Sequence, residues 1–270
     1  MEEKQFVYES NPVENCKLCG SAEKVVFLSP TEFGDGKSSL VRCSNCGMTY
    51  IDPAPTKDAL KKFYEDTYLT PEYRKIDGAS IPDPRQELLY TFQVMEKHLD
   101  EIEKRKTPPG NILDVGCSHG AFMLEANSRG WTTVGVEPFQ AAAEFCKNSL
   151  GLNVHNKDIM DAELPENHYD VISMWEVIEH VFDPVSVMKK IWKLAKPGGI
   201  LIMSSPNAES PASLITRGQW VGLKFPTHLQ FFGYGTLPRL LLESGWKSIE
   251  VKSGGGYPGQ IMAIAECMKK

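Results

Sequence analysis

The arrangement of apolar and polar positions along this chain changes near residue 111. From there to the C-terminus, short apolar runs of strand length are separated by segments whose apolar residues recur at helical spacing. The predicted strands are 111–116, 132–137, 153–158, 169–175, 200–207, 247–255 and 259–267. The predicted helices are 121–130, 138–151 and 236–246, and 183–199 is predicted to be a helix followed by a turn. Short strands alternating with helices predict a doubly wound, Rossmann-like α/β sheet of seven strands. Ligands bind to such sheets at the carboxyl ends of the strands.

The chain before residue 111 divides into two further parts. Residues 1–52 contain paired cysteines, and residues 53–110 form a helical bridge or cap. The bridge ends in a long predicted helix, 85–106, which "TPPG" terminates. Its apolar residues at helical spacing are Leu88, Leu89, Phe92, Met95, Leu99 and Ile102. The third part, the α/β domain, is predicted to occupy residues 111–270.

The paired cysteines form two matched C-x-x-C motifs, each followed by glycine: Cys16 and Cys19, then Cys43 and Cys46. In a chain without a recognisable export signal, such pairs indicate a metal site rather than disulfides. Four thiolates complete the tetrahedral coordination of Zn²⁺ and leave no position open for catalysis. Residues 1–52 are therefore predicted to be a zinc-ribbon-like module that gains its fold from the metal. A redox role for the two pairs is the alternative.

Composition narrows the choice of partners. The 270 residues carry a formal net charge of −6, with 41% hydrophobic and 24% charged residues. These percentages are ordinary for a globular protein. The negative net charge argues against a positively charged surface that binds nucleic acid. No apolar run approaches the roughly 18 residues of a membrane span, and "MEEKQFVYES" lacks the features of a secretion signal. We expect a cytoplasmic protein, a monomer or homodimer, that acts on a small molecule.

A glycine loop follows the first predicted strand of the α/β domain. In "DVGCSHG" the spacing is Gly116-x-x-x-Gly120, and Ser118 takes the place of the middle glycine of a dinucleotide-binding loop. That replacement argues against a diphosphate ligand. Acidic residues lie at three strand ends. Asp114 suits a ligand ammonium group, Glu137 suits ribose hydroxyls and Asp158 suits an adenine amino group.

These segments resemble, in order, the motifs of class I S-adenosylmethionine-dependent methyltransferases. The resemblance is carried by "LDVGCSHGAF", "VGVEP", "DIM", "YDVISMWEVIEH" and "KPGGILIMSSPN", between residue 111 and about 205. It implies that Asp114 and Gly116 contact the methionine part of the cofactor. Glu137 would then contact the ribose, and Asp158 the adenine. The other residues that it places at the cofactor are Cys117, Gly120, Pro138, Ile159 and Trp175.

The segment after the fourth predicted strand is where a methyl acceptor is expected. Glu176, Glu179 and His180 fit the pattern E-x-x-E-H, which resembles the O-methyltransferases of ubiquinone biosynthesis. The resemblance implies that the three hold a divalent ion such as Mg²⁺ beside the acceptor hydroxyl. A metal ion or an imidazole lowers the barrier to deprotonating a hydroxyl. Acids and histidines at this place without any metal are the alternative.

Residues 206–235 form an insert rich in aromatic residues around His228. Its position predicts a substrate lid, although most of the aromatics are expected simply to pack beneath it. The "HLQFF" stretch resembles methyltransferases of sugar and polysaccharide biosynthesis, some of which are C-methyltransferases with paired N-terminal cysteines. Those relatives carry Tyr and Glu where this chain has Phe225 and Thr227, and they have a further C-terminal domain. His228 remains a candidate base.

The favoured function is therefore O-methylation of a small hydroxylated metabolite: a sugar, nucleotide sugar or quinone- or phenol-like compound. Sugar C-methylation, rRNA base methylation and a non-catalytic adaptor that binds the cofactor are alternatives. The acidic balance and the absence of an Asn/Asp-Pro-Pro-aromatic motif argue against a base as acceptor. The acids at the strand ends argue against an adaptor.

Overall fold

The computed structural model describes residues 8–33, 37–64, 84–254 and 259–269. The chain forms two compact units. Unit 1 comprises Met1–Pro82, Glu179–Phe182 and Pro206–Thr236, and unit 2 comprises Asp83–Ile178, Asp183–Ser205 and Leu237–Lys270. The middle of the predicted bridge, 65–83, lies outside the described residues. No helix in the described ranges combines the length and the apolar character that crossing a bilayer requires.

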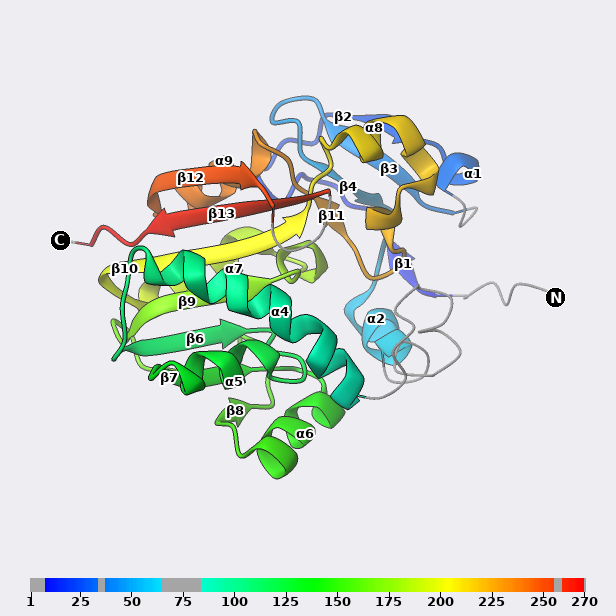
Figure 1. Cartoon of the computed structure of the whole chain (residues 1–270). Helices are drawn as coiled ribbons and strands as arrows, with labels where there is room; N and C mark the ends of the chain where they lie inside the picture. The colour runs from blue at the N-terminus through cyan, green and yellow to red at the C-terminus, as the bar shows by residue number, and fades with distance from the viewer. Residues whose placement is uncertain (1–7, 34–36, 65–83, 255–258, 270) are drawn as a thin grey trace. The chain divides into compact units, whose positions relative to one another are not determined.

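Unit 2 is built on a seven-stranded sheet with the order β12-β13-β10-β9-β6-β7-β8 (Figure 1). Its strands are β6 (Asn111–Val115), β7 (Thr132–Val136), β8 (Val154–His155), β9 (Tyr169–Trp175), β10 (Ala195–Pro206), β12 (Lys247–Ser253) and β13 (Gln260–Glu266). The pairs from β10 through β9, β6 and β7 to β8 are parallel, and β12 is antiparallel to β13. The predicted doubly wound α/β fold is confirmed. The strand order reverses at β6, which places the topological switch point between β6 and β9.

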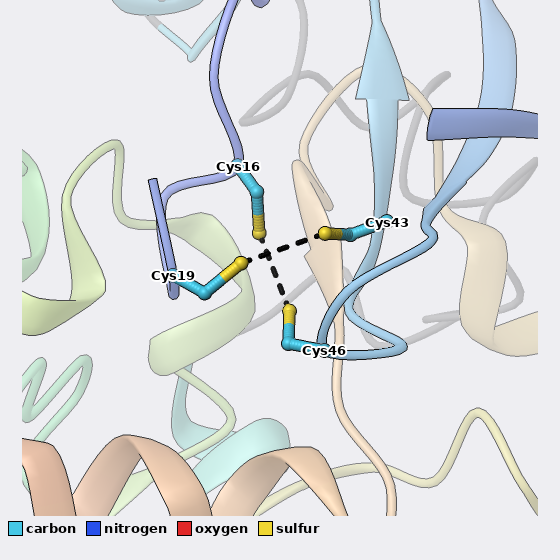
Figure 2. Close-up of side chains that lie close together, drawn as sticks. All are labelled: Cys16, Cys19, Cys43 and Cys46. Atoms are coloured by element: carbon cyan, nitrogen blue, oxygen red, sulfur yellow. Dashed lines mark hydrogen bonds between the residues drawn. The ribbon is translucent and has the colours of Figure 1, made fainter. Parts of the chain in front are cut away.

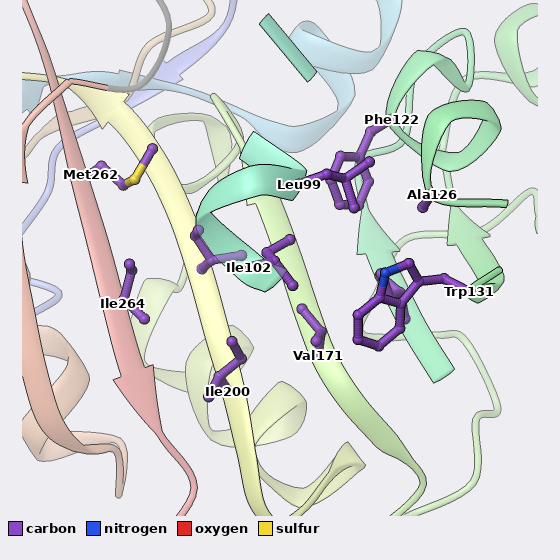
Figure 3. Close-up of a cluster of buried hydrophobic side chains, with 11 residues drawn as sticks. Leu99, Ile102, Phe122, Ala126, Trp131, Val171, Ile200, Met262 and Ile264 are labelled. Carbon is purple, nitrogen blue, oxygen red and sulfur yellow. The ribbon is translucent and has the colours of Figure 1, made fainter. Parts of the chain in front are cut away.

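Helices cover both faces of this sheet (Figure 1). The helices α4 (Pro84–Glu103), α5 (Ala121–Ser128) and α6 (Gln140–Leu150) lie on one face, and α7 (Pro184–Leu194) and α9 (Thr236–Glu243) lie on the other. Figure 3 shows the core between α4, α5 and the sheet, in which Leu99 and Ile102 meet Phe122 and the strand residues Val171 and Ile200. These side chains are at most 2% exposed, so burial of apolar surface holds the glycine loop between β6 and α5 in place.

The segment 183–199, predicted as a helix followed by a turn, divides differently in the structure. Its last five residues, 195–199, open β10. Pro197 lacks the N–H that a continuing helix would need. The backbone N–H of Gly198 donates to the carbonyl oxygen of Cys267 over 2.7 Å, and the N–H of Cys267 donates to that of Gly199 over 2.8 Å. Backbone hydrogen bonds with Cys267, which directly follows β13, therefore make residues 195–199 part of a strand.

Unit 1 has a four-stranded sheet with the order β11-β4-β3-β2. The strands β2 (Lys24–Leu28), β3 (Ser39–Cys43) and β4 (Thr49–Asp52) come from the N-terminal module, and β11 (Gln230–Phe231) comes from the 206–235 insert. Its smaller elements are β1 (Ser10–Asn11), α1 (Pro30–Phe33), β5 (Ala54–Pro55), α2 (Lys57–Phe63), η2 (Ile178–His180, which begins in unit 2), α8 (Pro211–Thr216), η3 (Arg217–Gln219) and η4 (Val221–Leu223). The insert thus adds a strand to the sheet of the cysteine module.

The aromatic residues of the insert pack in the core of unit 1. Trp220, Leu223 and Phe231 are buried against Leu28 and Ile51 of the N-terminal strands. Phe232 is fully buried, whereas Tyr234 is 44% exposed. The expectation that most of these aromatics pack beneath the insert is confirmed.

Candidate functional site

The glycine loop lies between β6 and α5, at the carboxyl end of β6. Gly116 and Gly120 have φ angles of 72° and 79°, a region that side chains other than glycine disfavour. A Cβ on Gly116 would lie 2.5 Å from Cγ2 of Val177, and one on Gly120 would lie 2.5 Å from Cδ1 of Leu152. Both positions therefore require glycine for its backbone and for the space around it.

Asp114 is held at the end of β6 by a residue of the neighbouring strand β9. The Oγ of Ser173 donates to its Oδ1 over 2.7 Å, and the residue is 1% exposed. Burial raises the pKa of Asp114 to about 7, and the nearby Glu137 acts in the same direction. A cation at this position would favour the ionised carboxylate.

Glu137 follows β7 and joins two loops. Its Oε2 accepts from the backbone N–H of Ser118 over 2.9 Å, and its Oε1 accepts from that of Phe139 over 2.9 Å. Burial raises the pKa of Glu137. A carboxylate has about four acceptor positions, so these two bonds leave capacity for two further donors. The vicinal hydroxyls of a ribose are such a pair.

Asp158 and Ile159 follow β8. Asp158 is exposed, and its Oδ1 accepts from the N–H of Met160 over 2.8 Å. Ile159 is 6% exposed, so the turn places a carboxylate beside an apolar side chain. Pro138 is exposed, and its carbonyl oxygen accepts from Nδ2 of Asn156 over 3.0 Å.

Two other predicted cofactor residues have partners within unit 2. Cys117 donates its backbone N–H to the carbonyl oxygen of Val136 over 3.2 Å, and its side chain is buried in an apolar cluster. Trp175, at the end of β9, stacks on His98 with ring centroids 3.9 Å apart and meets Phe122 edge-on. The backbone N–H of Cys117 is thus already hydrogen-bonded within unit 2, and the ring of Trp175 is held in place by its contacts with His98 and Phe122.

A cluster of titratable side chains occurs in unit 1. Glu179, His180 and His228 each offer a ligand atom, and these atoms lie within 4.8 Å of one another. Hydrogen bonds join the two segments that carry them. The N–H of Leu229 donates to the carbonyl oxygen of Glu179 over 2.8 Å, and Nε2 of Gln230 donates to that of Val181 over 2.6 Å.

Backbone carbonyls determine the tautomer of both histidines. The Nδ1 of His180 lies 2.9 Å from the carbonyl oxygen of Thr227, and the Nδ1 of His228 lies 2.8 Å from that of Gly222. A carbonyl oxygen can only accept, so each Nδ1 carries the proton and each Nε2 keeps its lone pair. The hydroxyl oxygen of Tyr64, which follows α2, lies 3.1 Å from Nδ1 of His180.

Both imidazoles are neutral at physiological pH. Burial lowers the pKa of His180 to about 4, although its hydrogen bond to Thr227 acts in the opposite direction. Burial, reinforced by the neighbouring His180, lowers the pKa of His228 well below its usual value. The cluster can therefore accept a proton or a metal ion without first losing a proton from either ring.

Glu176, the first acid of the E-x-x-E-H pattern, belongs to unit 2. Its Oε1 accepts from Oγ of Ser204 over 2.8 Å. Its φ of 54° is uncommon for a residue with a side chain and occurs often at functional sites. Among the described residues, the acid and histidines that converge are thus Glu179, His180 and His228.

The four N-terminal cysteines converge in unit 1 (Figure 2). The Sγ atoms of Cys16 and Cys46 are 3.5 Å apart, as are those of Cys19 and Cys43, and all four lie within 4.8 Å of one another. A tetrahedral zinc site with bonds of about 2.3 Å has sulfur–sulfur edges of about 3.8 Å. Burial, with Cys19 and Cys16 nearby, raises the pKa of Cys46, so a cation is needed to stabilise four thiolates together. The donor set fits Zn²⁺.

The structure also identifies residues that the motifs did not indicate. Ser173 positions Asp114, and Tyr64 contacts His180. The carbonyl groups of Gly222 and Thr227 orient the two rings. Ser173 could have been found as a polar residue within a buried strand, "YDVISMW", whereas backbone carbonyls leave no trace in a sequence.

The chain matches known proteins mainly through unit 2. A model of the methyltransferase domain family matches residues 88–251. The ubiquinone biosynthesis O-methyltransferase of Nitrosospira multiformis is 30% identical over 133 residues, 46% of this chain and 55% of that protein. That of Pseudomonas fluorescens is 34% identical over 121 residues, 42% of this chain and 52% of that protein. The chain thus spans about half the length of these curated relatives.

Solved structures share the fold at low identity. A SAM-dependent methyltransferase from Archaeoglobus fulgidus superposes with a TM-score of 0.54 at 19% identity, covering 65% of this chain and 94% of that one. A phosphoethanolamine N-methyltransferase of Haemonchus contortus, solved with S-adenosyl-L-methionine, has a TM-score of 0.59 at 11% identity. It covers 82% of this chain and 63% of that one.

Proposed function

Because this chain belongs to the methyltransferase domain family, we propose that it transfers a methyl group from S-adenosylmethionine to a hydroxyl group of a small metabolite. The acceptor class is a sugar, a nucleotide sugar or a quinone- or phenol-like compound. The observation that carries the proposal is a set of carboxylates at the carboxyl ends of three neighbouring parallel strands: Asp114 in β6, Glu137 after β7 and Asp158 after β8.

Each carboxylate suits one part of the cofactor. Asp114 pairs with the methionine ammonium group, which compensates the burial that raises its pKa. Glu137 has two acceptor positions for the ribose hydroxyls, and Asp158 accepts from the adenine amino group beside Ile159. The backbone at Gly116 and Gly120, with Pro138 and Trp175, completes the proposed site. Cys117 contributes through its position in the loop.

The acceptor hydroxyl is proposed to meet Glu179, His180 and His228. Glu179 follows the last residue of β9 by four positions in the sequence, and methyl acceptors are expected near the carboxyl end of that strand. When bound, S-adenosylmethionine supplies a methyl carbon made electrophilic by its sulfonium. The cluster lowers the cost of removing the hydroxyl proton, because an imidazole lone pair or the carboxylate accepts that proton as it leaves the oxygen.

Methyl transfer is tested with S-adenosylmethionine labelled in its methyl group. The full chain is incubated with panels of phenols, quinols, sugars and sugar nucleotides, and labelled products are identified by mass spectrometry. We expect label on an oxygen of one panel member, and its loss in both His180→Ala and His228→Ala. Label on carbon would instead support the sugar C-methyltransferase alternative. Full activity in both variants would refute the proposed acceptor site.

We further propose that Cys16, Cys19, Cys43 and Cys46 hold a structural zinc ion. The two halves of the cluster are matched turns, since Gly20 donates its N–H to the carbonyl of Cys16 over 2.8 Å and Gly47 donates to that of Cys43 over 3.0 Å. The ion would join the segment before β2 to the end of β3 and so stabilise the sheet to which β11 belongs.

A further inference from the structure

We propose that unit 1 binds one small inorganic anion, such as chloride, in a cavity lined by the sheet of the cysteine module and by the 206–235 insert. Arg42 and Thr49 line it from β3 and β4, and Arg217 and Trp220 line it from the insert. All four residues belong to unit 1. The cavity measures about 20 Å³. One water molecule needs roughly 10–15 Å³, so there is room for an ion somewhat larger than water.

A buried hydrogen-bond donor without a partner is the first support. The Nε atom of Arg42 is buried, and in the part of the chain that the structure describes its N–H meets no acceptor. A guanidinium group stays protonated and can only donate. A donor that loses water and gains no acceptor destabilises the fold, most of all when it carries charge. An acceptor in the cavity that Arg42 lines would satisfy this donor.

The charge of the lining favours an anion over a water molecule. The guanidinium carbon of Arg42 lies 4.6 Å from the ring centre of Phe27, and that of Arg217 lies 5.9 Å from the same centre. Both arginines line the cavity, and none of its described lining residues is acidic. A water molecule would accept the hydrogen bond of Nε but leave the positive charges as they are. An anion accepts the bond and also compensates the charges.

The walls of the cavity strengthen this attraction. Leu40, Trp220 and Phe231 line it and are buried, and electrostatic interactions are stronger in such apolar surroundings than in water. Thr49 is also buried and adds a hydroxyl group that can donate to an anion. Arg217 is exposed, so one side of the lining faces solvent and allows an ion to enter.

An anion at this place would join the cysteine module to the insert. Arg42 belongs to β3 and Arg217 to η3, and Nη2 of Arg217 already donates to the carbonyl oxygen of Phe27 over 3.3 Å. The lining residue Trp220 is two positions before Gly222, whose carbonyl oxygen accepts from Nδ1 of His228. Binding should therefore stabilise unit 1, including the segment that orients His228. This effect on stability does not depend on the proposed methyl transfer.

Bromide, a heavier halide that anomalous scattering can identify, tests the position of the ion. Crystals of the zinc-loaded full chain are grown with sodium bromide, and diffraction is measured at the bromine absorption edge. We expect an anomalous peak in the cavity, within hydrogen-bond distance of Nε of Arg42, and no such peak in Arg42→Met. A water molecule without anomalous signal at this place, or an empty cavity, would overturn the proposal.

Thermal unfolding of the zinc-loaded chain tests binding in solution. Replacing sodium gluconate by sodium chloride at constant ionic strength should raise the melting temperature saturably, by about 3 °C at roughly ten times the Kd of the ion. Arg42→Met and Arg217→Met should each lose most of this shift. Arg239→Met should keep it, because Nε of Arg239 already donates to Glu243.

Zinc content and circular dichroism show whether each variant is folded. If Arg42→Met folds poorly, Arg217→Met carries the comparison, since it changes an exposed residue. A melting temperature of the wild type that does not respond to chloride would overturn the proposal. A chloride shift that persists in full in the folded arginine variants would overturn it as well, because the ion would then bind elsewhere.

Discussion

Ser173 Oγ donates a hydrogen bond to Asp114 Oδ1 over 2.7 Å, from the middle of β9 to the fourth residue of β6. The bond lies inside the sheet, where Asp114 is 1% exposed. It favours the carboxylate, while burial favours the protonated acid, and burial is the larger effect. The balance leaves the pKa of Asp114 at about 7.

Cofactor affinity should therefore depend on pH. Between the usual pKa of 3.8 and about 7, the folded protein without ligand binds more protons at Asp114 than the unfolded chain does. Its stability thus falls as the pH rises through this window. The ammonium group favours the carboxylate, so affinity for S-adenosylmethionine should fall by up to about tenfold per pH unit below about 7. Glu137, whose pKa is also raised, adds to the slope.

Calorimetric titration at several pH values measures this dependence. Asp114→Asn should reduce the slope, and Ser173→Ala should move the loss of affinity to higher pH because it removes a bond to the carboxylate. Asp161→Asn, a change at an exposed acid, is the matched control. Identical profiles for wild type and Asp114→Asn would contradict the assignment.

Replacing Glu137 should weaken binding of S-adenosylmethionine, because the ribose hydroxyls would lose a charged hydrogen-bond acceptor. Hydrogen bonds to a charged group contribute about 1.5–3 kcal/mol, so Glu137→Gln should reduce affinity for S-adenosylmethionine by roughly 10- to 150-fold. Glu163→Gln, at an exposed position, should have no effect. Since Glu137 also accepts from Ser118 and Phe139, the melting temperature of the variant must be measured beside its affinity.

Gly116→Ala should destabilise unit 2 by two separable effects. The left-handed backbone costs about 1–2 kcal/mol for alanine, and the new Cβ would lie 2.5 Å from Val177. Val177→Ala in the same chain should relieve the contact but leave the cost of the backbone. Urea unfolding of both single variants and the double variant gives the coupling energy. Additive losses would show that Val177 does not limit this position.

Removal of zinc should unfold unit 1 selectively. Cys46→Ser leaves three thiolates, so zinc content measured by mass spectrometry should fall well below one ion per chain, and hydrogen exchange in β2, β3 and β4 should accelerate. Cys267→Ser changes a cysteine outside the cluster and should keep the zinc. Unchanged exchange after chelation would contradict a structural role for the ion.

The sequence sufficed for the elements whose signals are local. The order of strands and helices from Asn111 onward follows from apolar periodicity, and the cysteine pairs follow from their spacing. The glycines of the loop were recognisable because the backbone requires them. These features depend on residues that are close in the chain.

Features that depend on contacts between distant segments have no local signal in the sequence. The pairing of β11, from the 206–235 insert, with β4 of the cysteine module is one such feature. The role of the insert as a substrate lid stays a prediction. His228 was predicted to serve the acceptor together with Glu176, Glu179 and His180, but no local pattern indicates that Glu179, His180 and His228 converge. Their convergence depends on backbone bonds between the segments around 179–181 and 227–230.

The central claim is that unit 2 binds S-adenosylmethionine through the acids at its strand ends. Isothermal titration calorimetry of the full chain with S-adenosylmethionine and with its demethylated product, S-adenosylhomocysteine, tests it most directly. We predict saturable binding of both at one site per chain, weakened by Glu137→Gln and unchanged by Glu163→Gln. A folded protein that binds neither compound would contradict the account.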